Sequence, residues 1–321
     1  MILYLEKYGC NLYYLSHIWF LGFFIFIREP FFLLIVNKSM RTIKQIHPAK
    51  YCPIEDLITY SPLPSENTVQ IDPFLALNHH GPQCFIPENN GLPFGPHPHR
   101  GIETVTLILE GEILHKDASG NEVVIKSGGI QWVTAGRGMI HAVTATEEFK
   151  EHGGRLEFLQ VLLNLPAKHK MILPRYISLQ KEQIPSIKTD KNRIEIRLIA
   201  GSLDNQKGVI ETISDITMAL IKFKPEGRLR IAILKEFNIF FYVVSGSIRV
   251  NNKQVDKLNL VEFNMDQELL DIVAIKESVL FFGFAKPLNE PVVINGPFVM
   301  NNDQEIRQAY KDFYRGKMGR L

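Results

Sequence analysis

The stretch ETVTLILEGEILHKDASGNEVVIKSGGIQWVTAG, residues 103 to 136, decides the fold class of this chain. Its segments ETVTLIL, EILHK and EVVIK have strand length and many β-branched residues, and DASGN between the last two is typical of a hairpin turn. Short apolar runs broken by Gly, Asn and Asp continue in this way from about residue 61 to residue 290. The sequence therefore predicts an all-β protein.

A second stretch resembles the first and indicates two copies of one β unit. LILEGEILHKD, residues 107 to 117, corresponds to YVVSGSIRVNN, residues 242 to 252, and Gly111 then aligns with Gly246. The segment around residues 165 to 192 is rich in Pro, Lys and Gln and lacks periodicity, which is typical of a linker. We expect one unit over residues 40 to 175 and a second over residues 190 to 300.

Helical periodicity is clear only at the end of the chain, residues 301 to 321. Asn302 or Asp303 would cap this helix, and Ile306, Tyr310 and Phe313 would share its apolar face. A short C-terminal helix is therefore expected.

Composition excludes several classes of protein. The chain has 321 residues, enough for two domains, and its 36 basic and 34 acidic residues leave a net charge of +2, so no direct nucleic-acid binding is expected. Its three cysteines are far apart and form no CxxC pair, which argues against a disulfide framework or a thiolate zinc site. We expect a cytoplasmic protein.

Residues 1 to 39 form an apolar extension. Residues 8 to 27, YGCNLYYLSHIWFLGFFIFI, carry no charged side chain and are long enough to span a bilayer, but no small-residue cleavage pattern follows. Three interpretations stay open: a gene start placed upstream of the biological start at Met40, a membrane anchor, or a buried helix. An anchor followed by basic residues would leave the main body on the cytoplasmic side.

Three histidines in the first unit form a candidate metal site. His97 and His99 in FGPHPHRGIETV, residues 94 to 105, lie two apart and would point to the same side of a strand. His141 follows a turn containing Gly136 and Gly138, which would return the chain beside this pair. Three neutral imidazoles plus a carboxylate suit Fe, Mn, Ni, Cu or Zn rather than Mg or Ca, which prefer oxygen ligands.

The second unit lacks these side chains. The offset between Gly111 and Gly246 places Ala232 and Leu234 at the positions of the first two histidines, and the last histidine of the chain is His169. We therefore expect one metal-binding unit and one structural unit.

The segments GPHPHRGIETVTLILEGE, GGIQWVTAGRGMIHA and EPVVINGPFVMNNDQEI resemble the pirin family, which includes bacterial quercetin dioxygenases, over roughly residues 41 to 315. The resemblance implies two jelly-roll (cupin) β-barrels in tandem, with one metal, expected to be Fe(II), in the N-terminal barrel. It implies a dioxygenase that acts with dioxygen on a flavonol-like, quercetin-type enol. As the alternative, it also allows a metal- or redox-sensing regulator that binds a protein partner without catalysis. His97, His99 and His141 match three of the family's ligand positions.

The fourth ligand position of the family departs from the pattern. In the family, the third ligand histidine is followed by Ala-Glu. In this chain the position of that glutamate is Val143, whose side chain can neither bind a metal nor accept a proton. Glu103 could replace that glutamate as ligand and base, or it could be a structural residue beside Arg100. Alternatively, three histidines bind the metal with an open position, or the barrel binds metal too weakly for turnover.

Two further histidines, His79 and His80 in NHHGP, precede the candidate site. One could line the pocket or support a ligand histidine by a hydrogen bond. A solvated loop is the interpretation that we favour for this pair.

Overall fold

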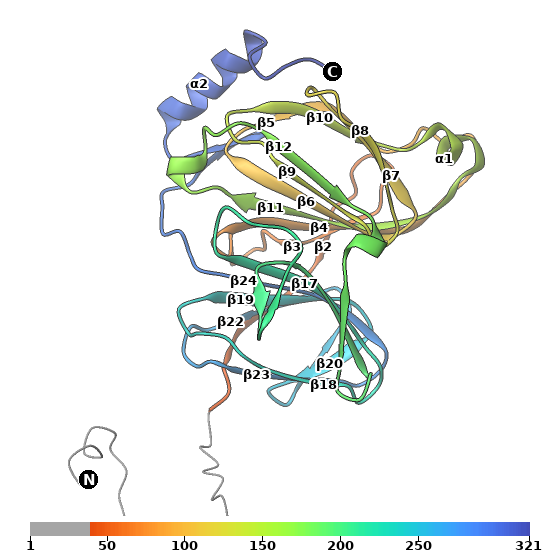
Figure 1. Ribbon diagram of the computed structural model, residues 1–321, viewed down its shortest axis with the longest axis vertical. Helices are drawn as coiled ribbons and strands as arrows, with labels where there is room; N and C mark the ends of the chain where they lie inside the picture. The colour runs from red at the N-terminus through yellow and green to blue at the C-terminus, as the bar shows by residue number, and fades with distance from the viewer. Residues whose placement is uncertain (1–38) are drawn as a thin grey trace, which may run out of the picture. The chain divides into compact units, whose positions relative to one another are not determined.

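β-Strands dominate the part of the chain that the structure describes, residues 39 to 321 of a computed structural model (Figure 1). They form two seven-stranded sheets, two four-stranded sheets and two small two-stranded ribbons. This arrangement confirms the predicted all-β fold. Our predictions for residues 1 to 38 lie outside the described residues. Among residues 39 to 321, no helix has the length and apolarity needed to cross a bilayer.

The N-terminal barrel has a seven-stranded sheet in the order β12-β9-β6-β11-β4-β3-β2, which faces a four-stranded sheet in the order β5-β10-β7-β8. Its strands are β2 Lys50–Tyr51, β3 Thr59–Leu63, β4 Phe74–Phe85, β5 Phe94–His99, β6 Ile102–Glu110, β7 Glu112–Asp117, β8 Glu122–Lys126, β9 Ile130–Thr134, β10 Met139–Thr144, β11 Gly154–Asn164 and β12 Arg175–Leu179. One short helix, α1 (Glu147–His152), lies between β10 and β11, and a single 3-10 turn, Ala167–His169, lies between β11 and β12. A second 3-10 turn, Lys181–Gln183, leads from β12 to β13 of the C-terminal barrel.

The C-terminal barrel repeats this plan, with sheets in the orders β1-β22-β19-β24-β17-β14-β13 and β18-β23-β20-β21. Its strands are β1 Ile43–Pro48, β13 Ser186–Thr189, β14 Ile194–Ala200, β17 Ile216–Phe223, β18 Arg228–Ala232, β19 Asn238–Ser245, β20 Ser247–Val250, β21 Lys253–Asp256, β22 Asn259–Phe263, β23 Leu269–Ala274 and β24 Ser278–Ala285. The ribbons are β15 Ser202–Leu203 with β16 Gln206–Lys207, and β25 Val293–Asn295 with β26 Phe298–Met300.

The first described strand, β1, belongs to the second barrel. It pairs antiparallel with β22, so that Ile46 lies opposite Val261. Sequence position alone assigns β1 to the first unit, but its backbone hydrogen bonds are made in the sheet of the other barrel.

The repeated glycines mark the same turn in both barrels. Gly111 separates β6 from β7 and Gly246 separates β19 from β20, with φ of 80° and 90°. A Cβ atom at Gly111 would lie 2.3 Å from the carbonyl oxygen of Arg155, so the turn requires glycine for its backbone conformation and for close approach.

The two barrels differ in what fills them. The interior of the C-terminal barrel is a continuous apolar cluster that includes Ile221, Phe241, Val261 and Phe282. A second apolar cluster lies where the two seven-stranded sheets meet, because it contains residues of both. The N-terminal barrel interior is partly polar, and the three candidate histidines, His97, His99 and His141, lie there.

Helix α2 (Asp303–Tyr314) is the predicted C-terminal helix (Figure 1). The side chain of Asn302 caps it by accepting a hydrogen bond from the backbone N–H of Glu305. Ile306 is buried and packs with Phe298 of β26, which places the helix against the segment that contacts the candidate site.

Candidate metal centre

The three histidines predicted from the sequence lie together on adjacent strands of the N-terminal barrel. β5 carries His97 and His99, β10 carries His141, and the antiparallel register places His141 opposite His97. The ring centroids are 4.6 to 5.1 Å apart. One candidate ligand atom from each lies within 4.8 Å of the others.

The hydrogen bonds of these rings leave the Nε2 atoms available to a metal. Nδ1 of His97 donates to the carbonyl oxygen of Gly95 at 2.7 Å, and Nδ1 of His99 donates to that of Pro297 at 3.3 Å. Nε2 of His97 faces Nε2 of His141 at 3.1 Å. Backbone carbonyls that hold Nδ1 and direct Nε2 to a common point are the usual support of ligand histidines.

Burial lowers the pKa of two of the three histidines, His99 and His141. It lowers the pKa of His99 to about 4, helped by His97 and opposed by the hydrogen bond to Pro297. Burial also lowers the pKa of His141 well below its usual value, and the neighbouring histidines add to this effect. Neutral imidazole is the form that binds a metal, so the donor set fits a divalent transition metal at neutral pH.

Glu103 does not join this group. Its Oε1 accepts hydrogen bonds from Nε1 of Trp132 at 2.9 Å and from Oγ1 of Thr134 at 2.6 Å. On β6 it alternates in phase with Val105 and Leu107, which pack in the cluster between the two seven-stranded sheets. Its carboxyl group is therefore on the sheet face that turns away from the barrel interior, and its burial raises its pKa.

Arg100, the expected neighbour of Glu103, has another partner. Its guanidinium is buried and donates to Asp312 of α2 at 3.0 Å and to the carbonyl oxygen of Arg137 at 2.6 Å. This ion pair ties the C-terminal helix to the residue that follows His99.

Val143 faces the same interior as the three histidines but has apolar neighbours. It lies two residues after His141 on β10 and packs in a cluster with Ile108, Phe158 and Phe94. The barrel interior therefore offers an apolar, aromatic wall on one side of the candidate centre.

The prediction of a solvated loop at His79 and His80 is wrong. Both are on β4 and are buried, with relative exposures of 1% and 0%. Nε2 of His79 donates to Glu157 at 2.9 Å, and its Nδ1 accepts from the hydroxyl of Tyr242 in the other barrel at 3.0 Å. His79 therefore links the two barrels, while His80 packs against Phe158 inside the first.

Sequence reasoning missed a fourth interior histidine, His115 on β7. Its ring stacks on Tyr176 and its centroid lies 5.7 Å from that of His141. The alternation in EILHKD could have indicated it, since Ile113, His115 and Asp117 are two residues apart and share one face of the strand.

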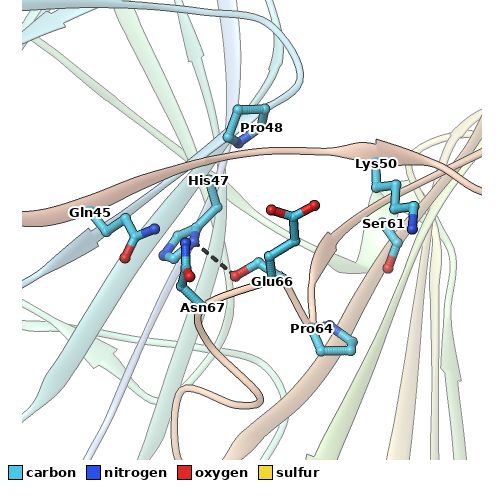
Figure 2. Close-up of a pocket in the computed structure, with 9 residues that line it drawn as sticks. Gln45, His47, Pro48, Lys50, Ser61, Pro64, Glu66 and Asn67 are labelled. Carbon is cyan, nitrogen blue, oxygen red and sulfur yellow. Dashed lines mark hydrogen bonds between the residues drawn. The ribbon is translucent and has the colours of Figure 1, made fainter.

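A cavity of about 480 Å³ lies away from the histidine group, and Figure 2 shows the residues that line it. His47 of β1 is buried there, where its Nε2 donates to Glu262 at 3.0 Å and its Nδ1 accepts from Ser65 at 2.9 Å. Both ring nitrogens are thus satisfied, and the network ties β1 and the loop of Ser65 to β22.

Comparison with known proteins agrees with this geometry. The family profile Pirin matches residues 57–163, and the profile of the pirin C-terminal cupin domain matches residues 218–319. The chain is 34% identical to the "Putative quercetin 2,3-dioxygenase" of Pseudomonas aeruginosa, over 83% of this chain and 91% of that protein. It is 33% identical to the pirin-like protein of Solanum lycopersicum, over 78% of this chain and 82% of that protein.

Solved structures show the same fold. A quercetin 2,3-dioxygenase crystal structure from Acinetobacter baumannii is 31% identical, with a TM-score of 0.82 over 88% of this chain and 99% of that chain. A bacterial pirin from Escherichia coli in complex with nickel(II) is 19% identical, with a TM-score of 0.62 over 76% of this chain and 99% of that chain. The profiles, the relatives and the tandem cupin barrels show that this chain belongs to the pirin family.

Proposed function

We propose that this chain is a metal-dependent dioxygenase that acts on flavonol-like aromatic enols. The observation that carries the proposal is the group of three histidines, His97, His99 and His141, whose ligand atoms lie within 4.8 Å of one another. Fe(II) is the metal that we place first, with Mn, Ni, Cu and Zn as alternatives that the same ligands accept. The quercetin dioxygenase names of the relatives support the substrate class.

A bound divalent metal would act as a Lewis acid for the enol oxygen and for dioxygen. The chain's own residues supply orientation and environment. The carbonyl oxygens of Gly95 and Pro297 fix the rings of His97 and His99, and the apolar side chains beside Val143 suit an aromatic ring and exclude water.

We infer a structural role for Glu103, because its carboxyl group is already held by Trp132 and Thr134. Among residues 39 to 321, no carboxylate joins the group of three histidines. The enol would then enter as its anion, whose charge the metal site attracts, rather than lose its proton to a glutamate of the site.

The test measures metal content and turnover together. The full chain is loaded anaerobically with Fe(II), its metal is determined by mass spectrometry, and quercetin consumption is followed after oxygen is admitted. His97→Ala and His141→Ala should lose both metal and turnover. His152→Ala is the matched control, since His152 is exposed at the end of α1 and should keep both.

Stoichiometric metal without turnover on any enol would refute the dioxygenase and retain the metalloprotein. In that case a pull-down of protein partners, carried out once with the metal reduced and once with it oxidised, tests the regulatory alternative. Cytoplasmic location, the identity of the metal and any protein partner stay predictions from the sequence.

A further inference from the structure

A cleft lies at one edge of the contact between the two barrels. Its volume is about 170 Å³, and its lining comes from β6 and β11 of the first seven-stranded sheet and from β14, β17, β19 and β24 of the second. The turn of Ser127 and Gly128 and the exposed Lys181, which follows β12, complete the lining. Boundaries between domains are common places for small-molecule sites. None of the three candidate metal ligands lines this cleft, so it is a separate place in the molecule.

The inner part of the cleft is apolar. Leu220 of β17 and Val244 of β19 line it and are buried. A smaller cavity adjoins it, shares Leu220 in its lining, and is bounded by the buried side chains of Leu107 and Ile130. These four residues, except Leu220, belong to the apolar cluster between the two seven-stranded sheets. An apolar group that enters the cleft would therefore leave water and contact the edge of this cluster.

The outer part of the cleft is basic. Three cationic side chains and one acidic side chain line it, which gives a net charge of +2: Lys181, Arg197 and Lys222 with Glu157. The ammonium groups of Lys181 and Lys222 form no ion pair with a carboxylate of residues 39 to 321. Glu157 is already engaged, because Nε2 of His79 donates to its Oε1 at 2.9 Å. The cleft therefore attracts an anion.

Arg197 is the cation that lies deepest in the cleft. Its side chain is 15% exposed, and its Nε donates to Glu195 at 3.3 Å. A Cβ atom at Gly128 would lie 3.0 Å from Nη1 of Arg197 and 2.9 Å from Cγ of Lys181, so both side chains pack against the backbone of this glycine. Within residues 39 to 321, the terminal nitrogens of Arg197 form no hydrogen bond. A guanidinium edge that is free in this way can bind a carboxylate by two parallel hydrogen bonds.

We propose that this cleft binds a small amphipathic carboxylate. Its carboxylate group pairs with Arg197, and its apolar body lies against Leu220 and Val244. The cleft is smaller than the pockets of about 300 Å³ or more that take drug-sized ligands, so the apolar body is limited to about one ring.

A calorimetric titration of the full chain with benzoate tests this proposal. Wild type should bind benzoate with a Kd of about 1 mM or tighter. Arg197→Met, which keeps the length of the side chain but removes its charge, should weaken binding at least about tenfold. Benzamide has the ring without the charge and inorganic phosphate has the charge without the ring, so each should bind at least about tenfold more weakly than benzoate.

Three further variants locate the bound benzoate. Ser245 lies opposite Val279 in the register of β19 and β24, and both line the cleft, so Ser245→Phe should fill the cleft and prevent binding without a change in charge. Arg249→Met is the matched control for Arg197→Met, since Arg249 is exposed on β20 of the four-stranded sheet, and should bind benzoate as wild type does. His97→Ala should also bind it as wild type does, because a carboxylate held by the candidate metal centre would be lost in that variant.

Weaker binding in Arg197→Met and Ser245→Phe, with Arg249→Met and His97→Ala unchanged, is the result that supports the proposal. No binding to wild type at about 10 mM benzoate would overturn it, as would equal affinities of wild type and Arg197→Met. Phosphate that binds as tightly as benzoate would overturn the role of the apolar inner part. Loss of binding in His97→Ala alone would place benzoate at the histidines, which overturns the cleft site and leaves the proposed metal centre standing.

Discussion

Removal of Asp312 should destabilise the chain by about 3 kcal/mol or more. Arg100 is 3% exposed. In Asp312→Ala, its Nη2 loses the hydrogen bond of 3.0 Å to the carboxylate, and of these two bonds the guanidinium keeps the one from Nε to the carbonyl oxygen of Arg137. Breaking one side of a buried ion pair costs about 3 to 5 kcal/mol because an uncompensated charge stays buried. For a chain of this size, that loss corresponds to a fall in Tm of about 5 °C or more.

The measurement is urea unfolding of the full chain followed by fluorescence, with Tm by scanning calorimetry. Lys317→Ala is the matched control, since Lys317 contacts the same carboxylate at 2.9 Å but is 58% exposed, and its loss should cost less than about 1 kcal/mol. In Arg100→Met with Asp312→Ala, both charges are gone, and most of the stability should return. Equal losses in Asp312→Ala and Lys317→Ala would refute this reasoning.

Three further predictions concern single buried groups. Glu103→Gln should keep full metal content, measured by mass spectrometry, because the glutamine's carbonyl oxygen can still accept hydrogen bonds from Trp132 and Thr134. Loss of metal in this variant would show instead that the carboxylate of Glu103 takes part in metal binding. Burial lowers the pKa of His80 to about 3, with His79 adding to the effect, so its contribution to stability is complete above about pH 6.5 and is lost as the pH falls toward 3. The free energy of unfolding of His80→Phe should therefore depend less steeply on pH than that of wild type over this range, and parallel curves would contradict the assignment. Lys170→Met should lower the free energy of unfolding by about 3 kcal/mol, measured by urea unfolding, because the ammonium of buried Lys170 donates hydrogen bonds to Gly101, Asn164 and Val299. Lys168→Met is the control and should have little effect, since Lys168 is exposed on the same turn.

Local pattern was enough to predict the strands, the C-terminal helix and the three histidines. His97 and His99 share a face because side chains alternate along one strand, and no long-range information is needed to see this. The position of Glu103 could not be obtained in the same way. Between His99 and Glu103 the chain turns at Gly101, with φ of 79°, and passes from the four-stranded to the seven-stranded sheet, so the alternation does not carry across.

His79 and His80 were misjudged for a related reason. Asn, Gly and Pro around them are typical of a loop, but β4 is 12 residues long and continues through them, paired on both sides by β3 and β11. Tertiary pairing overrides such local preferences. His115 could have been placed in the interior from the alternation in EILHKD, which puts it on one face with Ile113 and Asp117. That it lies opposite Val143 depends on strand register, which a single sequence does not show.

The pairing of β1 with β22 has a consequence for the order in which the chain folds. The hydrogen bond between His47 and Glu262 joins residues 215 positions apart, and the strand that completes the second barrel's sheet emerges from the ribosome before the first barrel is made. β1 must therefore wait for most of the chain before it finds its partners. Such non-local contacts slow folding, because the loop must close before the contacts can stabilise it. A fragment cut between the barrels would lack an edge strand of the second sheet and leave β22 open to pairing with other chains.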